Sequence, residues 1–126
     1  MKLRSEQLWR SVAGLALLVG AGSVIAPSAL SRLYRMPADG MTGTAALGWK
    51  MFGVRTVTIG AAVLVGSAPA RQTVIPVQIF DQIVFLQALL TRSVPRQSAL
   101  MAMATSGAII ALSLAASRLE QSERRP

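Results

Sequence analysis

The residue with the clearest potential for chemistry is Asp81, which lies in the apolar stretch QIFDQIVFLQ. An ionised carboxylate in the middle of a membrane is costly, so it needs a cation, water or a proton close by. Gln78 and Gln82 flank Asp81 on the same side of a helix and offer amide donors. Arg55, in the preceding apolar segment, is the candidate cation.

Helix geometry indicates that Arg55 and Asp81 can meet. If the two segments form a hairpin folded near Ala70, Asp81 lies level with Gly60, and Arg55 lies about 7 Å farther from the turn. An extended arginine side chain spans that distance. Gly60 would then leave space at the level of the carboxylate.

Three interpretations of Asp81 follow. In the first, Arg55 and Asp81 form a buried ion pair that determines which helices pair, and Gln78 and Gln82 complete its hydrogen bonds. In the second, Asp81 lines a polar cavity, where it takes up a proton or meets a cationic or polar substrate. In the third, Asp81 faces another subunit.

The chain contains neither cysteine nor histidine. This absence removes disulfides, thiol nucleophiles, thiolate and imidazole metal ligands, and the most common general base. An enzyme built from this sequence would have to rely on Asp81, Arg55 and a few hydroxyl groups. We therefore expect no catalytic residue, no metal site and no cofactor.

The composition is that of a small membrane protein. The 126 residues are 52% hydrophobic and only 14% charged, with a mean hydropathy of +0.51, which allows one domain surrounded mostly by lipid. The net charge of +8 could in principle attract nucleic acid. The basic residues, however, fall mostly between the apolar runs, where they bind lipid headgroups, so we expect no nucleic-acid partner.

Four apolar segments are long enough to cross a bilayer. They cover about residues 11–30, 45–68, 73–91 and 97–117, after a basic segment at 1–10 and before a polar tail at 118–126 that we expect to fray. Short turns make the second and third segments antiparallel neighbours, and Pro76 falls in the first turn of the third. Because lipid leaves no partner for open strands, the prediction is an all-α fold, a four-helix transmembrane bundle.

The positive charges weakly favour an orientation with both termini in the cytoplasm. The cations then assigned to the cytoplasmic side are Lys2, Arg4, Arg10, Arg71, Arg118, Arg124 and Arg125, and those outside are Arg32, Arg35, Arg92 and Arg96. Trp9, Tyr34 and Trp49 lie near segment ends, so we interpret them as anchors at the membrane interface.

Small residues at helical spacing predict close packing between helices, which in lipid depends on Gly, Ala, Ser and Thr. Gly53 and Gly60 share a stripe of the second segment with Thr56, and Gly107 and Ala111 belong to a stripe of the fourth. These stripes pack either within one chain or against a second copy or another subunit.

Two stretches, KMFGVRTVTIG at 50–60 and PVQIFDQIVFLQALL at 76–90, resemble a pattern in uncharacterised small bacterial integral membrane proteins with four helices. In architecture these are similar to the broader DoxX-like group. The matching residues are Phe52, Gly53, Arg55, Gly60 and Asp81. The resemblance covers about the middle third of the chain and implies a fold but no established activity.

The function expected from these observations is that of a non-enzymatic accessory or assembly component of an envelope complex in the inner membrane, or of a homo-oligomer. Its partners would be the bilayer and either other membrane subunits or itself. The alternative is a small proton-coupled transporter, with Asp81 as the titrating group and Arg55 as its counter-charge.

Overall fold

The computed structural model describes residues 2–126, and it describes side chains from Arg4 onward. The described chain is helical and contains no strand, which confirms the predicted all-α class. The elements are α1 (Lys2–Ile25), α2 (Pro27–Leu33), the 3-10 turn η1 (Ala38–Gly40), α3 (Gly43–Leu64), α4 (Ala68–Thr91) and α5 (Arg96–Arg124).

The first predicted segment, 11–30, is wrong at both ends. Its helix begins at Lys2, within the basic segment 1–10, and stops at Ile25. The break comes at Pro27, because proline lacks an amide hydrogen and its ring clashes with the carbonyl four residues earlier. Pro27 then opens the separate short helix α2, where its missing donor costs least.

Pro76 lies in the interior of α4, not in the first turn as the sequence suggested. The helix begins earlier than predicted because Ser67 caps it, accepting a hydrogen bond from the Ala70 amide at 3.3 Å. Pro69 occupies the start of the helix instead. Proline at position 76 leaves the carbonyl of Gln72 without its helical amide partner.

The polar C-terminal segment was expected to fray, but it is helical, because α5 continues to Arg124. Side chains of α1 bind this extension. The Trp9 indole donates to Glu120 at 3.3 Å, and the Ser5 hydroxyl donates to Glu123 at 2.6 Å. The ends of α1 and α5 therefore form part of the folded molecule.

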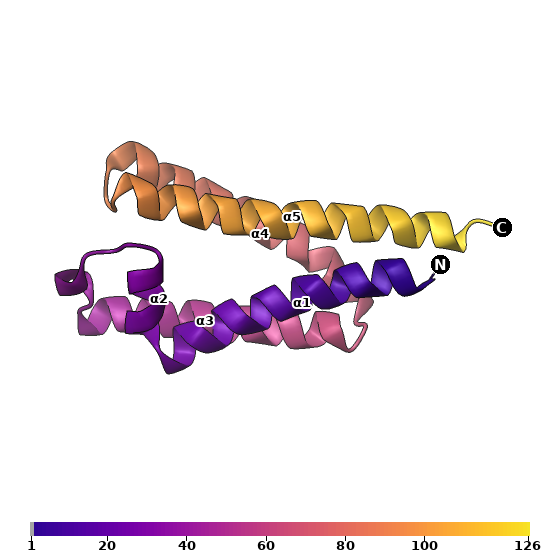
Figure 1. The fold of residues 1–126 in the computed structure, drawn as a ribbon, viewed down its shortest axis with the longest axis horizontal. Helices are drawn as coiled ribbons and strands as arrows, with labels where there is room; N and C mark the ends of the chain where they lie inside the picture. Colours follow the sequence, from indigo (N-terminus) through magenta and orange to yellow (C-terminus); the bar gives the residue numbers. More distant parts are fainter. Residues whose placement is uncertain (1) are drawn as a thin grey trace.

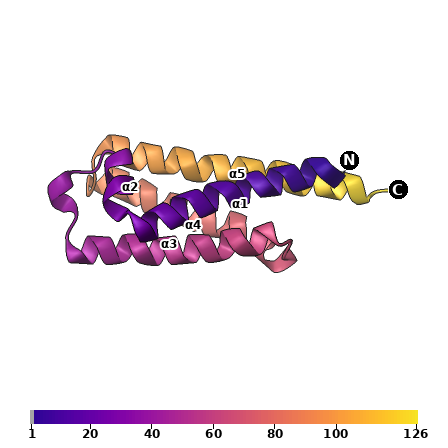
Figure 2. The same ribbon diagram turned by 60° about the horizontal axis from the view of Figure 1, so that its bottom comes forward.

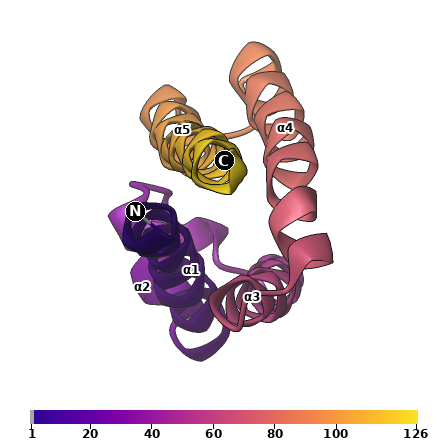
Figure 3. The same ribbon diagram turned by 90° about the vertical axis from the view of Figure 1, so that its right-hand side faces the viewer.

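The long helices form two pairs, α1 with α3 and α4 with α5, and α1 also packs along α5 (Figure 1). Both termini lie at one end of the molecule, and α2 with η1 lies at the other (Figures 1 and 2). Helix α4 starts beside the end of α3 and crosses towards α5 (Figure 3). The predicted hairpin of neighbouring helices is therefore correct near the turn, but α3 and α4 make few contacts with each other.

The buried core lies towards the end that carries the termini. It contains Trp9 and Val12 of α1, Val63 of α3, Val74 of α4 and Ile109 of α5. Many other large apolar side chains are exposed, including Val65 at 82% and Ile25 at 81%. Such an apolar surface is typical of a protein that faces lipid or further protein.

Within the described residues, three helices are long and apolar enough to cross a membrane. These stretches are Arg4–Ile25, Ala68–Thr91 and Arg96–Arg124. Helix α3 has 22 residues, but Lys50 and Arg55 interrupt its apolar stretch.

Candidate functional site

Arg55 and Asp81 are in direct contact across the gap between α3 and α4. Nη2 of Arg55 donates to both carboxylate oxygens of Asp81, at 2.9 Å to Oδ2 and 3.2 Å to Oδ1. The side chains are 42% and 14% exposed, respectively. The Arg55 guanidinium also lies 5.3 Å from the centre of the Phe52 ring, a favourable cation–π distance. Arg55 and Asp81 are therefore in contact, as the first interpretation predicted, but the Arg55 side of the pair is exposed rather than buried.

Gln78 and Gln82 do not complete the hydrogen bonds of Asp81, contrary to the prediction. Both turn towards α5: the Ser106 hydroxyl donates to Oε1 of Gln78 at 2.7 Å, and Nε2 of Gln82 donates to the Met103 carbonyl at 2.8 Å. The reason is helical spacing, because positions 78 and 82 share one face of α4 and position 81 lies on the adjacent face. The glutamines bind α4 to α5, while Asp81 binds it to α3.

Gly53 and Gly60 both face α1. A Cβ atom at Gly53 would lie 2.6 Å from the carbonyl oxygen of Gly20, and one at Gly60 would lie 3.0 Å from Cβ of Ala16. The expectation that Gly60 makes room beside Asp81 is therefore wrong. Its role is close packing of α3 against α1, which is the role predicted for its stripe.

The two small residues singled out in α5 have different surroundings. A Cβ at Gly107 would lie 3.5 Å from Nε2 of Gln82, so this glycine faces α4. Ala111 is exposed, so of the two alternatives predicted for its stripe it does not show packing within the chain and is open to a second copy or another subunit. The buried face of α5 is instead formed by Ser98, Ser106, Ile109, Ser113 and Ala116, together with Ala99.

Arg71 is an organising residue that sequence reasoning missed. Its side chain is 9% exposed and binds Glu6 of α1 at 2.8 Å, with Glu120 of α5 at 3.7 Å. It also donates to the Val63 carbonyl of α3 and lies 5.2 Å from the centre of the Trp9 ring. This one cation on α4 thus contacts α1, α3 and α5, at the end of the molecule that carries the termini.

The aromatic residues expected at the membrane interface are partly internal. Trp9 is 1% exposed beneath Arg71, and Tyr34 is 8% exposed. The Tyr34 hydroxyl forms a 3.0 Å hydrogen bond with Thr105. The interpretation as interfacial anchors is therefore wrong for Trp9 and Tyr34. Both find hydrogen-bonding partners inside the protein, which allows an amphipathic ring to be buried.

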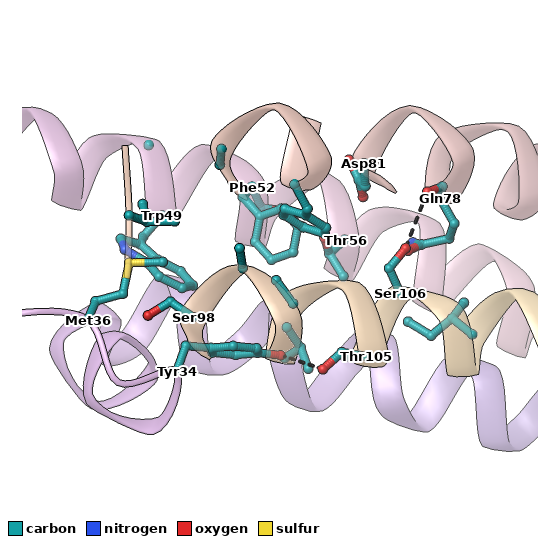
Figure 4. A pocket seen from close by; sticks show the side chains of 18 of the residues that line it. Tyr34, Met36, Trp49, Phe52, Thr56, Gln78, Asp81, Ser98, Thr105 and Ser106 are labelled. Carbon is teal, nitrogen blue, oxygen red and sulfur yellow. Dashed lines mark hydrogen bonds between the residues drawn. The ribbon is translucent and has the colours of Figure 1, made fainter. Parts of the chain in front are cut away.

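A cavity of about 380 Å³ lies on the side of Asp81 that faces away from the α3–α4 turn. Tyr34, Trp49 and Phe52 line one part of it, and Gln78, Asp81 and Ser106 line another (Figure 4). On the turn side of the ion pair, the hollow between the same helices is only about 20 Å³. The second interpretation of Asp81 placed a polar cavity here. Asp81 does line a cavity, but the lining is mostly apolar, and the cavity results from the separation of α3 and α4.

The polar groups at this site are few. The side chains that line the cavity carry one carboxylate, one amide, the indole N–H of Trp49 and a few hydroxyls, and the carboxylate is bound by Arg55. Among residues 4–126 there is no group of three acidic side chains arranged to hold a metal ion.

No protein-family model, curated protein or solved structure matches the chain.

Proposed function

We propose that this protein is a four-helix integral membrane protein of the bacterial inner membrane, and that it acts without catalysis by associating with other membrane helices. The associated helices belong either to further copies of the chain or to other subunits of an envelope complex. Both termini are placed in the cytoplasm, which agrees with their common end of the molecule (Figure 1) and with the bias of positive charge.

The fourth span in this proposal is α3, the helix with two cations. Two observations support its insertion. Asp81 neutralises Arg55, which lowers the cost of placing that cation in lipid. In addition, α3 lies so close to α1 that a Cβ atom at Gly53 would clash and one at Gly60 would be tightly packed. Lys50 is exposed and lies near the start of the helix, where a long side chain can reach the headgroups.

The observation that carries the association proposal is a row of alanines on α5. Ala104, Ala108, Ala111 and Ala115 are all exposed, and their spacing keeps them on one face of the helix. We call these residues the alanine row. Small side chains allow two membrane helices to approach closely, whereas lipid contact alone has no requirement for them. The row therefore suits a helix from outside the chain.

The test is native mass spectrometry of the protein released from lipid nanodiscs, for the wild type and an Ala111→Leu variant. We expect the wild type to appear as an oligomer or with a bound subunit, and the leucine to lower the assembled fraction severalfold. Ala61→Leu on α3, which is also exposed, is the matched control and should leave assembly unchanged. A wild-type protein that remains a monomer without a partner contradicts the proposal.

Proton-coupled transport is the alternative, and the observation that favours it is that Asp81 lines the cavity. In this case Asp81 must exchange a proton and release Arg55 during each cycle. Replacing Asp81 with Asn should then abolish a pH-dependent flux in proteoliposomes while assembly is retained. A flux that survives this substitution rules out the transporter.

A further inference from the structure

The proposed association between helices does not require the cavity of about 380 Å³. The cavity lies between α3 and α4, with α5 beneath, and its volume falls within the range of about 300–1,000 Å³ that is usual for small-molecule sites. Gly48 of α3 lines the cavity and is exposed, with nothing within 4 Å of the position of a Cβ atom. The cavity is therefore accessible from the side of the molecule, between two helices that contact each other little.

The charge around the cavity excludes most ionised ligands. Asp81 is the single charged residue among those that line it, and Arg55 already binds both carboxylate oxygens. An anion would meet the carboxylate, and a cation would have to displace Arg55. The remaining lining is mostly apolar, with Tyr34 and Trp49 towards one end and Phe52 between Trp49 and Asp81 (Figure 4). A neutral molecule with an apolar body fits these surroundings.

Ser98 identifies where a polar group of that molecule would bind. Its side chain is 0% exposed and lines the cavity, yet its hydroxyl has no hydrogen-bond partner within the described chain. Ser98 lies in the same part of the cavity as Tyr34, Met36 and Trp49 (Figure 4). A buried hydroxyl without a partner is unfavourable, and a ligand that supplies the missing hydrogen bond removes this cost.

We propose that the cavity is a binding site for a neutral, single-chain amphiphile that enters from the bilayer between α3 and α4. The apolar chain lies among Phe52, Phe85 and the small residues of α5, and a hydroxyl or carbonyl head binds Ser98. This site does not depend on the alanine row, which is formed by exposed residues of α5 that do not line the cavity.

The experiment is photolabelling in nanodiscs with a long-chain alcohol that carries a diazirine, followed by mapping of the labelled peptides. We expect labels on cavity-lining segments of α3, α4 and α5, and competition by the unmodified alcohol. A diazirine phosphatidylcholine distinguishes a specific site from a gap filled by bulk lipid. If it labels the same segments as efficiently as the alcohol, or if the alcohol labels only outward-facing residues, the proposal is wrong.

Matched variants test the two parts of the site. Ser98→Ala should weaken binding of the alcohol by about two- to tenfold, the value of one hydrogen bond. Ser113→Ala, which also removes a buried and unpartnered hydroxyl of α5 but lies outside the cavity, should have no effect on binding. Ala102→Phe fills the cavity and should abolish specific labelling, whereas Ala61→Phe on the exposed face of α3 should not. Equal binding by the Ser98 and Ser113 variants, or undiminished labelling of a folded Ala102 variant, contradicts the proposal.

Discussion

Among residues 4–126, Arg55 and Asp81 form an ion pair with each other and with no other residue, so each stabilises the charge of the other. The carboxylate is 14% exposed, and its contact with Nη2 of Arg55 is 2.9 Å long. Removing one partner leaves the other charge unpaired in an apolar setting, which costs more than removing both. The pair thus favours the register in which α3 and α4 meet.

The stability of single and double variants measures how much each charge depends on the other. Asp81→Asn should lower the free energy of unfolding by about 1–3 kcal/mol, because it strands the Arg55 cation, although the side chain can partly escape towards the headgroups. The double variant Arg55→Gln with Asp81→Asn should recover part of that loss. Reversible unfolding in mixed micelles provides the measurement. Equal stability of the wild type and Asp81→Asn would contradict a structural role for the pair.

Residue type and spacing were sufficient to predict the contact between Arg55 and Asp81, because an acid in an apolar helix needs a partner and few cations are within reach. They were insufficient to predict the role of Arg71, whose positive charge indicated only a position on the cytoplasmic side. Its role depends on Glu6 and Glu120, which are distant in sequence and meet it only when the ends of α1 and α5 lie beside the α3–α4 turn. The signal that could have found it was the presence of acids at both ends of a basic chain.

At the scale of elements, the closest helix contact is between α1 and α3. Gly20 and Gly53 face each other, and a Cβ at Gly53 would also lie 2.7 Å from Cγ2 of Val24. Helix α4 lacks such a contact with α3 and instead forms hydrogen bonds to α5 through Gln78 and Gln82. The two sides of α3 therefore differ: one is tightly packed and the other borders the cavity.

Two glycine-to-alanine variants of α3 should show that its two sides differ in how tightly they are packed. Gly53→Ala should lower the free energy of unfolding by about 1–3 kcal/mol, because the new methyl group would clash with the α1 backbone. Gly48→Ala, where nothing lies within 4 Å, should be neutral or stabilise by up to about 1 kcal/mol, since alanine is the better helix former. Denaturant titration of both variants in the same detergent gives the comparison. A Gly53 variant as stable as its Gly48 counterpart would refute the close approach.

The pattern of apolar runs was enough to predict where most helices lie. The ends of these helices depended on proline and capping residues, whose effects are harder to predict from the sequence. Pro27 breaks a run whose hydropathy is continuous, and the Ser67 cap starts α4 before its apolar stretch. A cavity beside Asp81 was one interpretation of the sequence, but its mostly apolar lining could not be predicted from any single segment, because it depends on how α4 diverges from α3.

For the whole molecule, the proposed topology has all the long helices crossing the membrane, α3 included. This arrangement places both termini and the α3–α4 turn on one side, and η1 and the α4–α5 turn on the other (Figure 1). If α3 lay along the surface instead, Arg55 would have water available and would need no partner in the bilayer. The roles assigned to the ion pair and the cavity therefore depend on this topology.

The most direct test is labelling of single cysteines with a membrane-impermeant maleimide, which is straightforward because the chain has no cysteine of its own. Four exposed positions are suitable: Asp39, Val65, Ser93 and Gln121. We predict that Asp39→Cys and Ser93→Cys react in intact spheroplasts, and that Val65→Cys and Gln121→Cys react only after the membrane is permeabilised. Labelling of Val65→Cys from the same side as Asp39→Cys would show that α3 does not cross the membrane, and would contradict the account.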